Sequence, residues 1–311
     1  MTNPSFLPEN IKLEKNVILE ELKMVKDNPA DDIFNYFYEV VFNSHPLSLP
    51  ILGTKKSLKA LDFEKICRYF STNFSLEGIV LSAAGNINHK VLVEKVKEHI
   101  NNSGDKAKKV PEKTVPARVI YQKKTRSYRG KTEASHICIG GPGCSRGNSE
   151  RYPLSLFTNI LGGSISSRLF QKVREEKGLS YTIFASNTQY TDSGIIVIYA
   201  ATSAANVNRV LDLINAEISD IKKSGIKKEE LVIAKENTKG NIVLGVEDIS
   251  SRMFRLGKSL LMDSNVFTID DILKKIDSIE LKDVNTIVDK YFQQEKLSLI
   301  IIGKNGNWRL K

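Results

Sequence analysis

The sequence predicts an α+β protein of two homologous α/β-sandwich domains, each with a mainly antiparallel sheet and helices packed on one face. Two observations predict this class. Strand-length apolar runs and long helical patterns both recur along the chain. The two parts of the chain also end alike, with a helical pattern that closes on Tyr-Phe at 69–70 or 291–292, a polar loop, and a buried strand at 78–86 or 297–305. A duplicated unit explains this repetition, and 311 residues are enough for two domains.

The first predicted domain, residues 1–103, is short of strands. Helical patterns at Glu9–Lys26 and Phe34–Phe42 are followed by the helix-and-strand unit, whose strand at Gly78–Asn86 is the one strong strand of this part. A sheet cannot be built from a single strand. We therefore expect that this domain has lost its beginning or that another chain supplies its neighbouring strands.

Most of the positive charge lies in one stretch between the two parts. Residues 104–131 hold ten Lys or Arg against two acidic residues, which is +8 of the total net charge of +10. The segment 104–116 has two prolines and little apolar content, so it is predicted to be a solvated basic linker. No helix-turn-helix, zinc-finger or RNA-binding motif accompanies the charge, and we expect no nucleic-acid partner.

The second predicted domain, residues 117–311, contains the elements of a complete sheet. Strands are predicted at Ala117–Gln122 and Ala134–Gly140, and a helix at Arg151–Leu161. A hairpin follows, with strands at 181–190 and 195–201 around Thr191-Asp192-Ser193-Gly194. Three long amphipathic patterns then predict helices at Val207–Lys223, Lys227–Leu244 and Ser250–Leu261.

Several features bear on the compartment. The most apolar run, Leu297–Ile302, has the length of a strand, so we expect no membrane segment. Residues 1–10 lack the basic start and apolar block of a signal peptide. The cysteines are odd in number and show no metal or disulfide spacing, which favours reduced thiols, at Cys67, Cys138 and Cys144. We therefore expect a cytoplasmic protein.

The stretch 162–181 is the most informative part of the chain. A glycine-serine loop leads into a helical pattern, Gly178 stands where a left-handed C-terminal cap belongs, and a strand opens at Tyr181. Arg174 and Tyr181 are thereby delivered to the same helix-to-strand corner. Taken alone, each part of this arrangement is also compatible with a purely structural role.

The opening helix carries two carboxylates within its apolar stripe. At 100° per residue, Glu14 and Glu21 fall in the middle of that stripe and Glu20 falls on the opposite, lysine-rich side. An unpaired buried charge costs several kcal/mol, so these carboxylates need a cation. The residues leave open an Arg or Lys from a neighbouring element, a partly wet face, or a metal ion.

The stretch 162–181 resembles the signature of the second domain in the pitrilysin/insulinase family of zinc metallopeptidases, which includes the mitochondrial processing peptidases. The segment Asn16–Met24 is similar to the family segment that carries the downstream zinc ligand. The resemblance, which covers about residues 4–303, implies that Arg174 and Tyr181 bind the peptide substrate, that Glu21 is a zinc ligand and that Glu14 is a supporting carboxylate. It also implies a processing-peptidase-like fold whose first domain is N-terminally truncated.

The chain departs from that family in one respect. The family's His-x-x-Glu-His motif, which supplies two imidazole ligands and the general base, does not occur in this sequence. No two of the four histidines stand four apart, and we assign structural or solvent roles to all of them: His45, His89, His99 and His136. One carboxylate does not hold zinc tightly. The chain alone is therefore predicted to bind zinc poorly and to be inactive.

The leading hypothesis is the downstream portion of a zinc endopeptidase that hydrolyses peptide bonds once a His-x-x-Glu-His segment or subunit completes it. The expected partner is that segment or subunit, or a second copy of the chain in a homodimer. The alternative is a non-catalytic partner subunit of a two-chain peptidase. A third hypothesis, a phosphate-binding module on the loop Gly162-Gly163-Ser164, is disfavoured because neither a GxxxxGK[ST] nor a strand-GxGxxG pattern is present.

Overall fold

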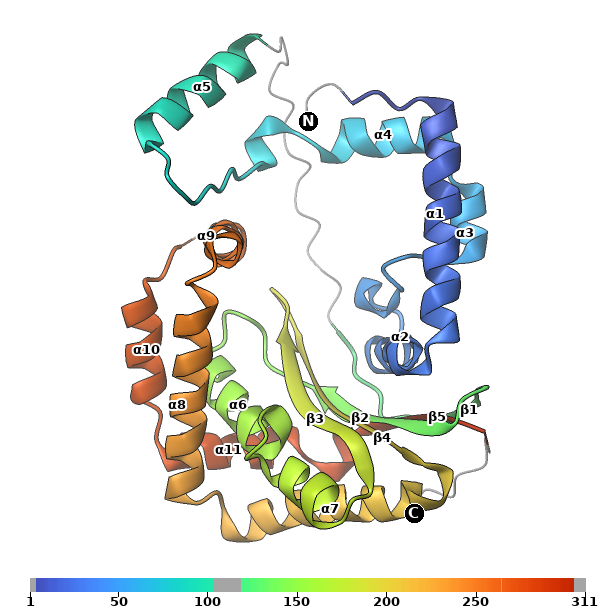
Figure 1. Ribbon diagram of the computed structural model, residues 1–311, viewed down its shortest axis with the longest axis vertical. Coiled ribbons are helices and arrows are strands. Elements are labelled where there is room, and N and C mark those ends of the chain that lie inside the picture. Colours follow the sequence, from blue (N-terminus) through green and yellow to red (C-terminus); the bar gives the residue numbers. More distant parts are fainter. Residues whose placement is uncertain (1–3, 103–118, 264, 305–311) are drawn as a thin grey trace. The chain divides into compact units, whose positions relative to one another are not determined.

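The computed structural model describes residues 4–102, 119–263 and 265–304 (Figure 1). The contacts divide the chain into two compact units. One unit takes residues from 1–23, 52–116 and 244–266, and the other from 24–51, 117–243 and 267–311. These units interleave along the chain, whereas the sequence predicted two contiguous domains. The division into homologous domains at 1–103 and 117–311 stays a prediction, and the predicted linker 104–116 lies outside the described residues.

A five-stranded mixed sheet forms the centre of the larger unit. Its order is β1-β5-β2-β4-β3, with β1 parallel to β5 and the other neighbours antiparallel. This confirms the predicted α+β class with a mainly antiparallel sheet. The strands are β1 (Thr125–Arg129), β2 (Ala134–Pro142), β3 (Ser180–Gln189), β4 (Gly194–Ser203) and β5 (Ser298–Gly303).

The two faces of this sheet bury alternate residues of each strand. Along β2, Ile137 and Ile139 contribute to the larger apolar cluster, and Cys138 contributes to the smaller one on the other face. In Figure 1 helices lie on both sides of the sheet. The larger cluster is covered by α6 (Arg151–Thr158), α7 (Val207–Ser224), α8 (Lys228–Gly245), α10 (Ile269–Asp277) and α11 (Leu281–Tyr291).

The prediction of helices on one face needs a correction, because α2 (Pro29–Phe42) covers the second face. Its buried side chains include Ile33, Phe37 and Val41, which belong to the smaller cluster. In the sequence, about eighty residues separate the end of this helix from the first strand of the sheet. Periodicity shows that a helix has an apolar side, but it does not show which sheet face that side covers.

The first strand also begins later than predicted. Residues 119–124 lie outside any strand, and pairing starts at Thr125, which stands opposite Leu299 of β5. The side chains of Val119 and Tyr121 pack against the smaller cluster. The apolar alternation that predicted a strand at 117–122 therefore reflects side-chain burial of an extended segment rather than a hydrogen-bonded ladder.

The smaller unit consists mainly of helices and contains one irregular segment that contacts α9. Its described helices are α3 (Lys55–Ala60), α4 (Phe63–Asn73), α5 (His89–Asn102), α9 (Ile249–Asp263) and most of α1 (Pro8–Asp27). Ser82 of the extended segment Ile79–Ala84 donates a hydrogen bond of 2.7 Å to the carbonyl of Met253 in α9. Among the described residues, this segment pairs with no strand, and Leu58 is the one buried apolar side chain of the unit.

Short helical turns complete the description. The 3-10 turns are η1 (Pro46–Ser48), η2 (Leu76–Gly78), η5 (Ala204–Asn206) and η6 (Gln294–Lys296), and two turns of π-helix are η3 (Asn159–Gly163) and η4 (Phe170–Glu176). Within the described part of the chain, no helix has both the length and the apolar character that crossing a bilayer requires.

Candidate functional site

The glycine-serine loop lies directly against the edge strand β3. The helix α6 continues into the π-turn η3, which ends at Gly163. A Cβ atom added to Gly162 would stand 2.4 Å from the backbone nitrogen of Ala185 in β3. The absence of a side chain at position 162 therefore permits the close approach of the loop to the strand.

The helical pattern that follows is wound as the π-turn η4, where an ordinary amphipathic helix was predicted. Leu169 and Val173 are fully buried and anchor the turn on the larger cluster. Gly178 has a φ of +59°, as its predicted cap position requires, and its amide donates to the carbonyl of Arg174 at 3.0 Å. Single π-turns are rare and occur often at functional sites.

Arg174 projects from this turn toward solvent. Its guanidinium lies 4.7 Å from the ring centroid of Phe170, and its Nε lies 3.8 Å from Oε1 of Glu175. The side chain keeps 45% of its surface exposed. Contacts of this kind hold the side chain over the turn and leave guanidinium donors available to a ligand.

Tyr181 is placed by an irregularity in the hairpin. Ser180 stands opposite Thr202 and Thr182 stands opposite Ala201, so Tyr181 is an extra residue in β3 without an opposing partner. The Ser180 hydroxyl donates to the carbonyl of Ala201 at 2.7 Å, which fixes the strand at this point. A bulge re-aims the side chain that it carries, and Tyr181 is 91% exposed.

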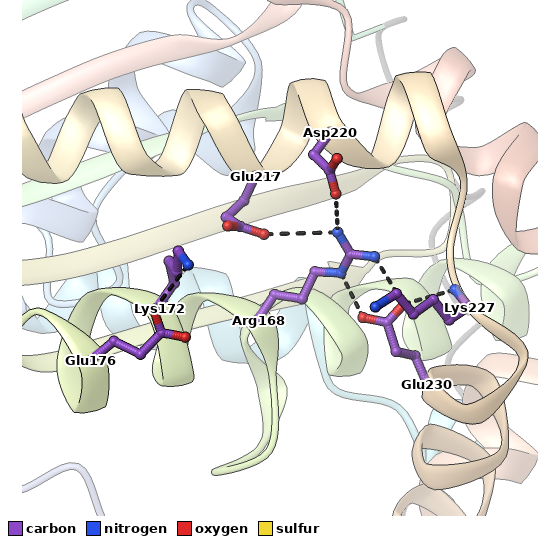
Figure 2. Close-up of polar contacts among 7 residues, drawn as sticks. All are labelled: Arg168, Lys172, Glu176, Glu217, Asp220, Lys227 and Glu230. Atoms are coloured by element: carbon purple, nitrogen blue, oxygen red, sulfur yellow. Dashed lines mark hydrogen bonds and ion pairs between the residues drawn. The ribbon is translucent and has the colours of Figure 1, made fainter.

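A cluster of charges that the sequence analysis did not predict lies directly before η4 and is centred on Arg168 (Figure 2). Arg168 makes a two-pronged contact with Glu230, at 2.6 Å and 2.9 Å, and a hydrogen bond of 2.8 Å to Asp220. Its Nη1 also lies 3.8 Å from Oε2 of Glu217. Hydrogen bonding to Glu230 raises the pKa of Arg168. In the sequence, Arg168 was only one charged residue next to the apolar residue Leu169. The structure shows that Ser167 and Leu169 on either side of it are buried.

The carboxylates of this cluster respond differently to their surroundings. Burial opposes the ionisation of Glu230, but hydrogen bonds from Arg168 and from the backbone of Lys227 outweigh it and lower the pKa of Glu230. Burial raises the pKa of Glu217, since the attraction of Arg168 is weaker than the desolvation and Asp220 adds a like charge. Ionised Glu217 therefore destabilises the folded state relative to protonated Glu217.

Replacing Glu217 by Gln is therefore expected to stabilise the protein at neutral pH. A raised pKa means that the folded state favours the protonated acid, so the stability contribution of Glu217 is complete below its unfolded pKa and is lost as the pH rises through its folded pKa. Gln resembles the protonated form. Thermal unfolding at pH 7 should show a gain of about 2–4 °C or less, and the gain should vanish below about pH 4. Glu229→Gln changes an exposed carboxylate of α8 and should leave the melting temperature unchanged at both pH values. A gain for Glu217→Gln that persists at low pH would contradict the raised pKa of Glu217.

The two carboxylates of α1 do not lie on a buried face. Glu14 and Glu21 are both exposed, and α1 contains no buried residue. Among the apolar residues of the same stripe, Val17 is exposed and the others are half-buried: Ile11, Ile18, Leu22 and Val25. The predicted burial is therefore wrong, because the helical wheel groups residues by face whereas burial depends on what covers that face. The roles of Glu21 as a zinc ligand and of Glu14 as its support rest on the resemblance and stay predictions.

The histidines occupy four separate environments. The Nδ1 of His45 accepts from the amide of Leu47 at 3.2 Å, and its Nε2 lies 3.9 Å from Asp192. His136 is buried at 2.8 Å from the Tyr199 hydroxyl, and burial lowers the pKa of His136. His89 and His99 are exposed on α5. Over residues 4–102, 119–263 and 265–304, no three His, Cys, Asp or Glu side chains gather as metal ligands. Zinc requires at least three protein ligands, so the described donor set does not fit this metal by itself.

Comparisons with known proteins show the family and the fold of the chain. The profile of the "Peptidase M16 inactive domain" matches residues 60–238. The chain belongs to the peptidase M16 family. This is the pitrilysin/insulinase family of metallopeptidases that the sequence resembles, which confirms the predicted membership.

The similar proteins include an uncharacterized zinc protease of Bacillus subtilis, which is 33% identical over 97% of this chain and 73% of its own length. An uncharacterized zinc protease of Streptomyces coelicolor is 30% identical over 96% of this chain and 66% of its own. The chain thus spans about two thirds to three quarters of the length of these M16 relatives.

Solved structures show the same fold at low sequence identity. A protease from Helicobacter pylori matches with a TM-score of 0.87 and 17% identity, over 97% of this chain and 74% of the other. A peptidase M16 inactive domain from Pseudomonas fluorescens matches with a TM-score of 0.81 and 18% identity, over 99% and 74% respectively. These likenesses establish the M16 fold for the chain.

Proposed function

We propose that this M16 chain is the downstream portion of a zinc metalloendopeptidase, which hydrolyses peptide bonds only when a segment carrying His-x-x-Glu-His completes it. The observation that carries the proposal is the corner formed by η4 and the start of β3. There a left-handed glycine and a β-bulge present Arg174 and Tyr181 to solvent above a fully buried support. A substrate-binding role explains why such a well-anchored corner displays two exposed, hydrogen-bonding side chains.

The chemistry of the two side chains suits an extended peptide. The guanidinium of Arg174 offers several N–H donors in a planar arrangement, and the phenol of Tyr181 donates one O–H. Peptide carbonyls are acceptors, and their oxygens gain negative charge during hydrolysis, so donors aimed at them favour the transition state. We infer that Arg174 and Tyr181 bind the carbonyls near the scissile bond.

The smaller unit supports the need for a completing segment. Among its described residues, the extended segment Ile79–Ala84 has no strand partner and Leu58 is the one buried apolar side chain. Large side chains on several of its elements are exposed, including Phe63, Phe74, Leu81, Phe254 and Leu261. A partner polypeptide would cover such exposed apolar side chains, and a segment outside the strand ladder leaves backbone groups that a partner strand could pair with. A polypeptide that brings strands to Ile79–Ala84 would pair with the backbone of this segment and cover the exposed apolar side chains.

Complementation tests the proposal. The chain is co-expressed with a second polypeptide that carries a His-x-x-Glu-His motif, and cleavage of a quenched fluorescent peptide and zinc per complex are measured. Activity and one zinc are expected for the complex and neither for the chain alone. Glu21→Gln should lower the zinc content and the activity, because zinc loses a carboxylate ligand. Glu20→Gln is the matched control, since Glu20 is an adjacent exposed carboxylate that pairs with Lys23 at 2.6 Å.

The second candidate is a non-catalytic partner subunit of a two-chain M16 peptidase. The exposure of Glu21 favours it, since a scaffold has no need to bury a ligand at this position. In this case the complex with a complete peptidase subunit would be active, and Glu21→Gln would leave both its zinc content and its rate unchanged. A complex that forms only as a homodimer and cleaves nothing would contradict both functions.

A further inference from the structure

Arg168 is the polar anchor of the turn that carries Arg174. It stands two residues before η4, between Ser167 and Leu169, both of which are buried, and its own side chain is 12% exposed. Its three carboxylate partners come from distant parts of the chain, as Figure 2 shows: Glu217 and Asp220 from the last turns of α7, and Glu230 from the first turn of α8. One guanidinium thus joins η4 to two helices.

The geometry of these contacts requires an arginine. The Nε and Nη2 atoms of Arg168 donate to the two oxygens of Glu230, while Nη1 donates to Asp220. A planar guanidinium makes such a two-pronged contact and a third bond at the same time, whereas a lysine ammonium provides a single point of charge. Glu230 is itself held in place, because its Oε2 accepts from the backbone amide of Lys227 at 2.7 Å.

Besides backbone hydrogen bonds such as that from Gly178 to Arg174, apolar contacts hold the turn in the core. The turn is seven residues long, its buried side chain is Val173, and Leu169 is buried directly before it. Apolar contacts of this kind set the depth of a turn in the core but tolerate rotation and sliding more readily than a directional charged hydrogen bond does. Arg174 lies on η4, six residues beyond Arg168, and the helical residues 168–169 lead directly into that turn, so the position of Arg174 depends on how the start of the segment is held.

We propose that Arg168 is a positioning residue for Arg174, acting through its contacts with Asp220 and Glu230. This inference rests on the proposed function, in which Arg174 binds the peptide. Lys172 provides a matched control, since it is a cation of the same turn whose hydrogen-bonded ion pair lies within the turn, with Glu176 at 2.9 Å, and whose side chain remains 41% exposed. Its loss removes the same charge and leaves the hydrogen bonds of Arg168 to Asp220 and Glu230 in place.

The first measurement needs no activity. The Nε–Hε signal of Arg174 is recorded by nuclear magnetic resonance on the whole chain and assigned by its loss in Arg174→Lys. Arg168→Gln should shift or broaden this signal, and Lys172→Gln should leave it nearly unchanged. Asp220→Asn, which removes one exposed partner and leaves Glu230 in place, should give a smaller shift and serves if Arg168→Gln does not fold. If the Arg174 signal of Arg168→Gln is the same as that of the wild type, the inference is overturned. If only Asp220→Asn folds, a wild-type Arg174 signal in that variant overturns it.

The second measurement is a double-mutant cycle on the complemented enzyme. Arg168→Gln should lower kcat/KM about tenfold to a hundredfold, as misplacement of a binding group does. In the Arg174→Ala background the same substitution should cost nothing further, because its effect passes through Arg174. Arg168→Lys should recover part of the loss. Fully additive losses overturn the inference even if the complemented enzyme is active. An inactive complemented wild type contradicts the proposed function instead, and the Arg174 signal then decides the positioning role alone.

Discussion

Replacing Arg174 by Ala is expected to lower kcat/KM of the complemented enzyme about 10²- to 10³-fold while leaving its thermal stability close to that of the wild type. The activity loss follows because the variant removes a charged donor directed at the peptide carbonyls, and one such donor contributes this much to acyl-transfer reactions. Stability should persist because the Arg174 side chain is 45% exposed and its contacts, with Phe170 and Glu175, lie at the surface.

Two variants make this expectation specific. Arg209→Ala removes an exposed guanidinium of α7 that is bonded only weakly to Asn206, at 3.5 Å, and should leave kcat/KM unchanged. Tyr181→Phe keeps the ring on the bulge and deletes the hydroxyl, so a smaller loss than that of Arg174→Ala is expected. Steady-state kinetics and thermal unfolding on the same preparations check both. If the Arg174→Ala enzyme had the kcat/KM of the wild type, Arg174 and its corner would not be part of the substrate-binding site.

The second large effect concerns the centre of the sheet. Gly140→Ala is expected to destabilise the larger unit by about 3 kcal/mol or more. A Cβ at position 140 would stand 1.9 Å from the carbonyl oxygen of Ile196 in β4 and 2.9 Å from the ring of Phe37 in α2. Neither neighbour can move freely, since Ile196 belongs to the ladder between β2 and β4 and Phe37 is fully buried. Urea unfolding of the chain, followed by circular dichroism, measures the loss.

A second glycine supplies the matched control. Gly240 lies inside α8, and a Cβ added there would meet no atom within 4 Å outside the helix's own backbone, so Gly240→Ala makes no clash. Alanine is favoured over glycine inside a helix by roughly 0.5–1 kcal/mol. This variant should therefore be slightly more stable than the wild type. Equal stability of the two variants would show that strand β2 is not as tightly enclosed as the structure indicates.

Local features of the corner could be predicted because each depends on neighbouring residues. Gly178 was expected at a left-handed position because only glycine adopts it without strain, and its φ of +59° agrees. The hairpin around 191–194 was expected from its turn residues and alternating apolar pattern, and β3 and β4 pair across it. The resemblance then assigned roles to Arg174 and Tyr181, and the M16 membership is confirmed.

Other features of the same region depended on contacts that sequence spacing does not encode. The bulge at Tyr181 arises from the register of β3 against β4, which no pattern of alternation specifies. The π-winding of η4 differs from an ordinary helix by the hydrogen bonds it selects, while its apolar spacing is similar. Pattern reasoning therefore located the corner but could not describe its geometry.

By itself, the sequence determined the α+β class, the positions of most helices and strands, and the order of residues from Gly162 to Tyr181 that marks the M16 family. The tertiary structure decided which amphipathic faces are covered. It buried α2 on the second sheet face, left Glu14 and Glu21 exposed on α1, and brought Glu217, Asp220 and Glu230 to Arg168 from about fifty to sixty residues away. The physical reason is that periodicity is a property of one segment, whereas burial and charge pairing are properties of two segments that meet in space.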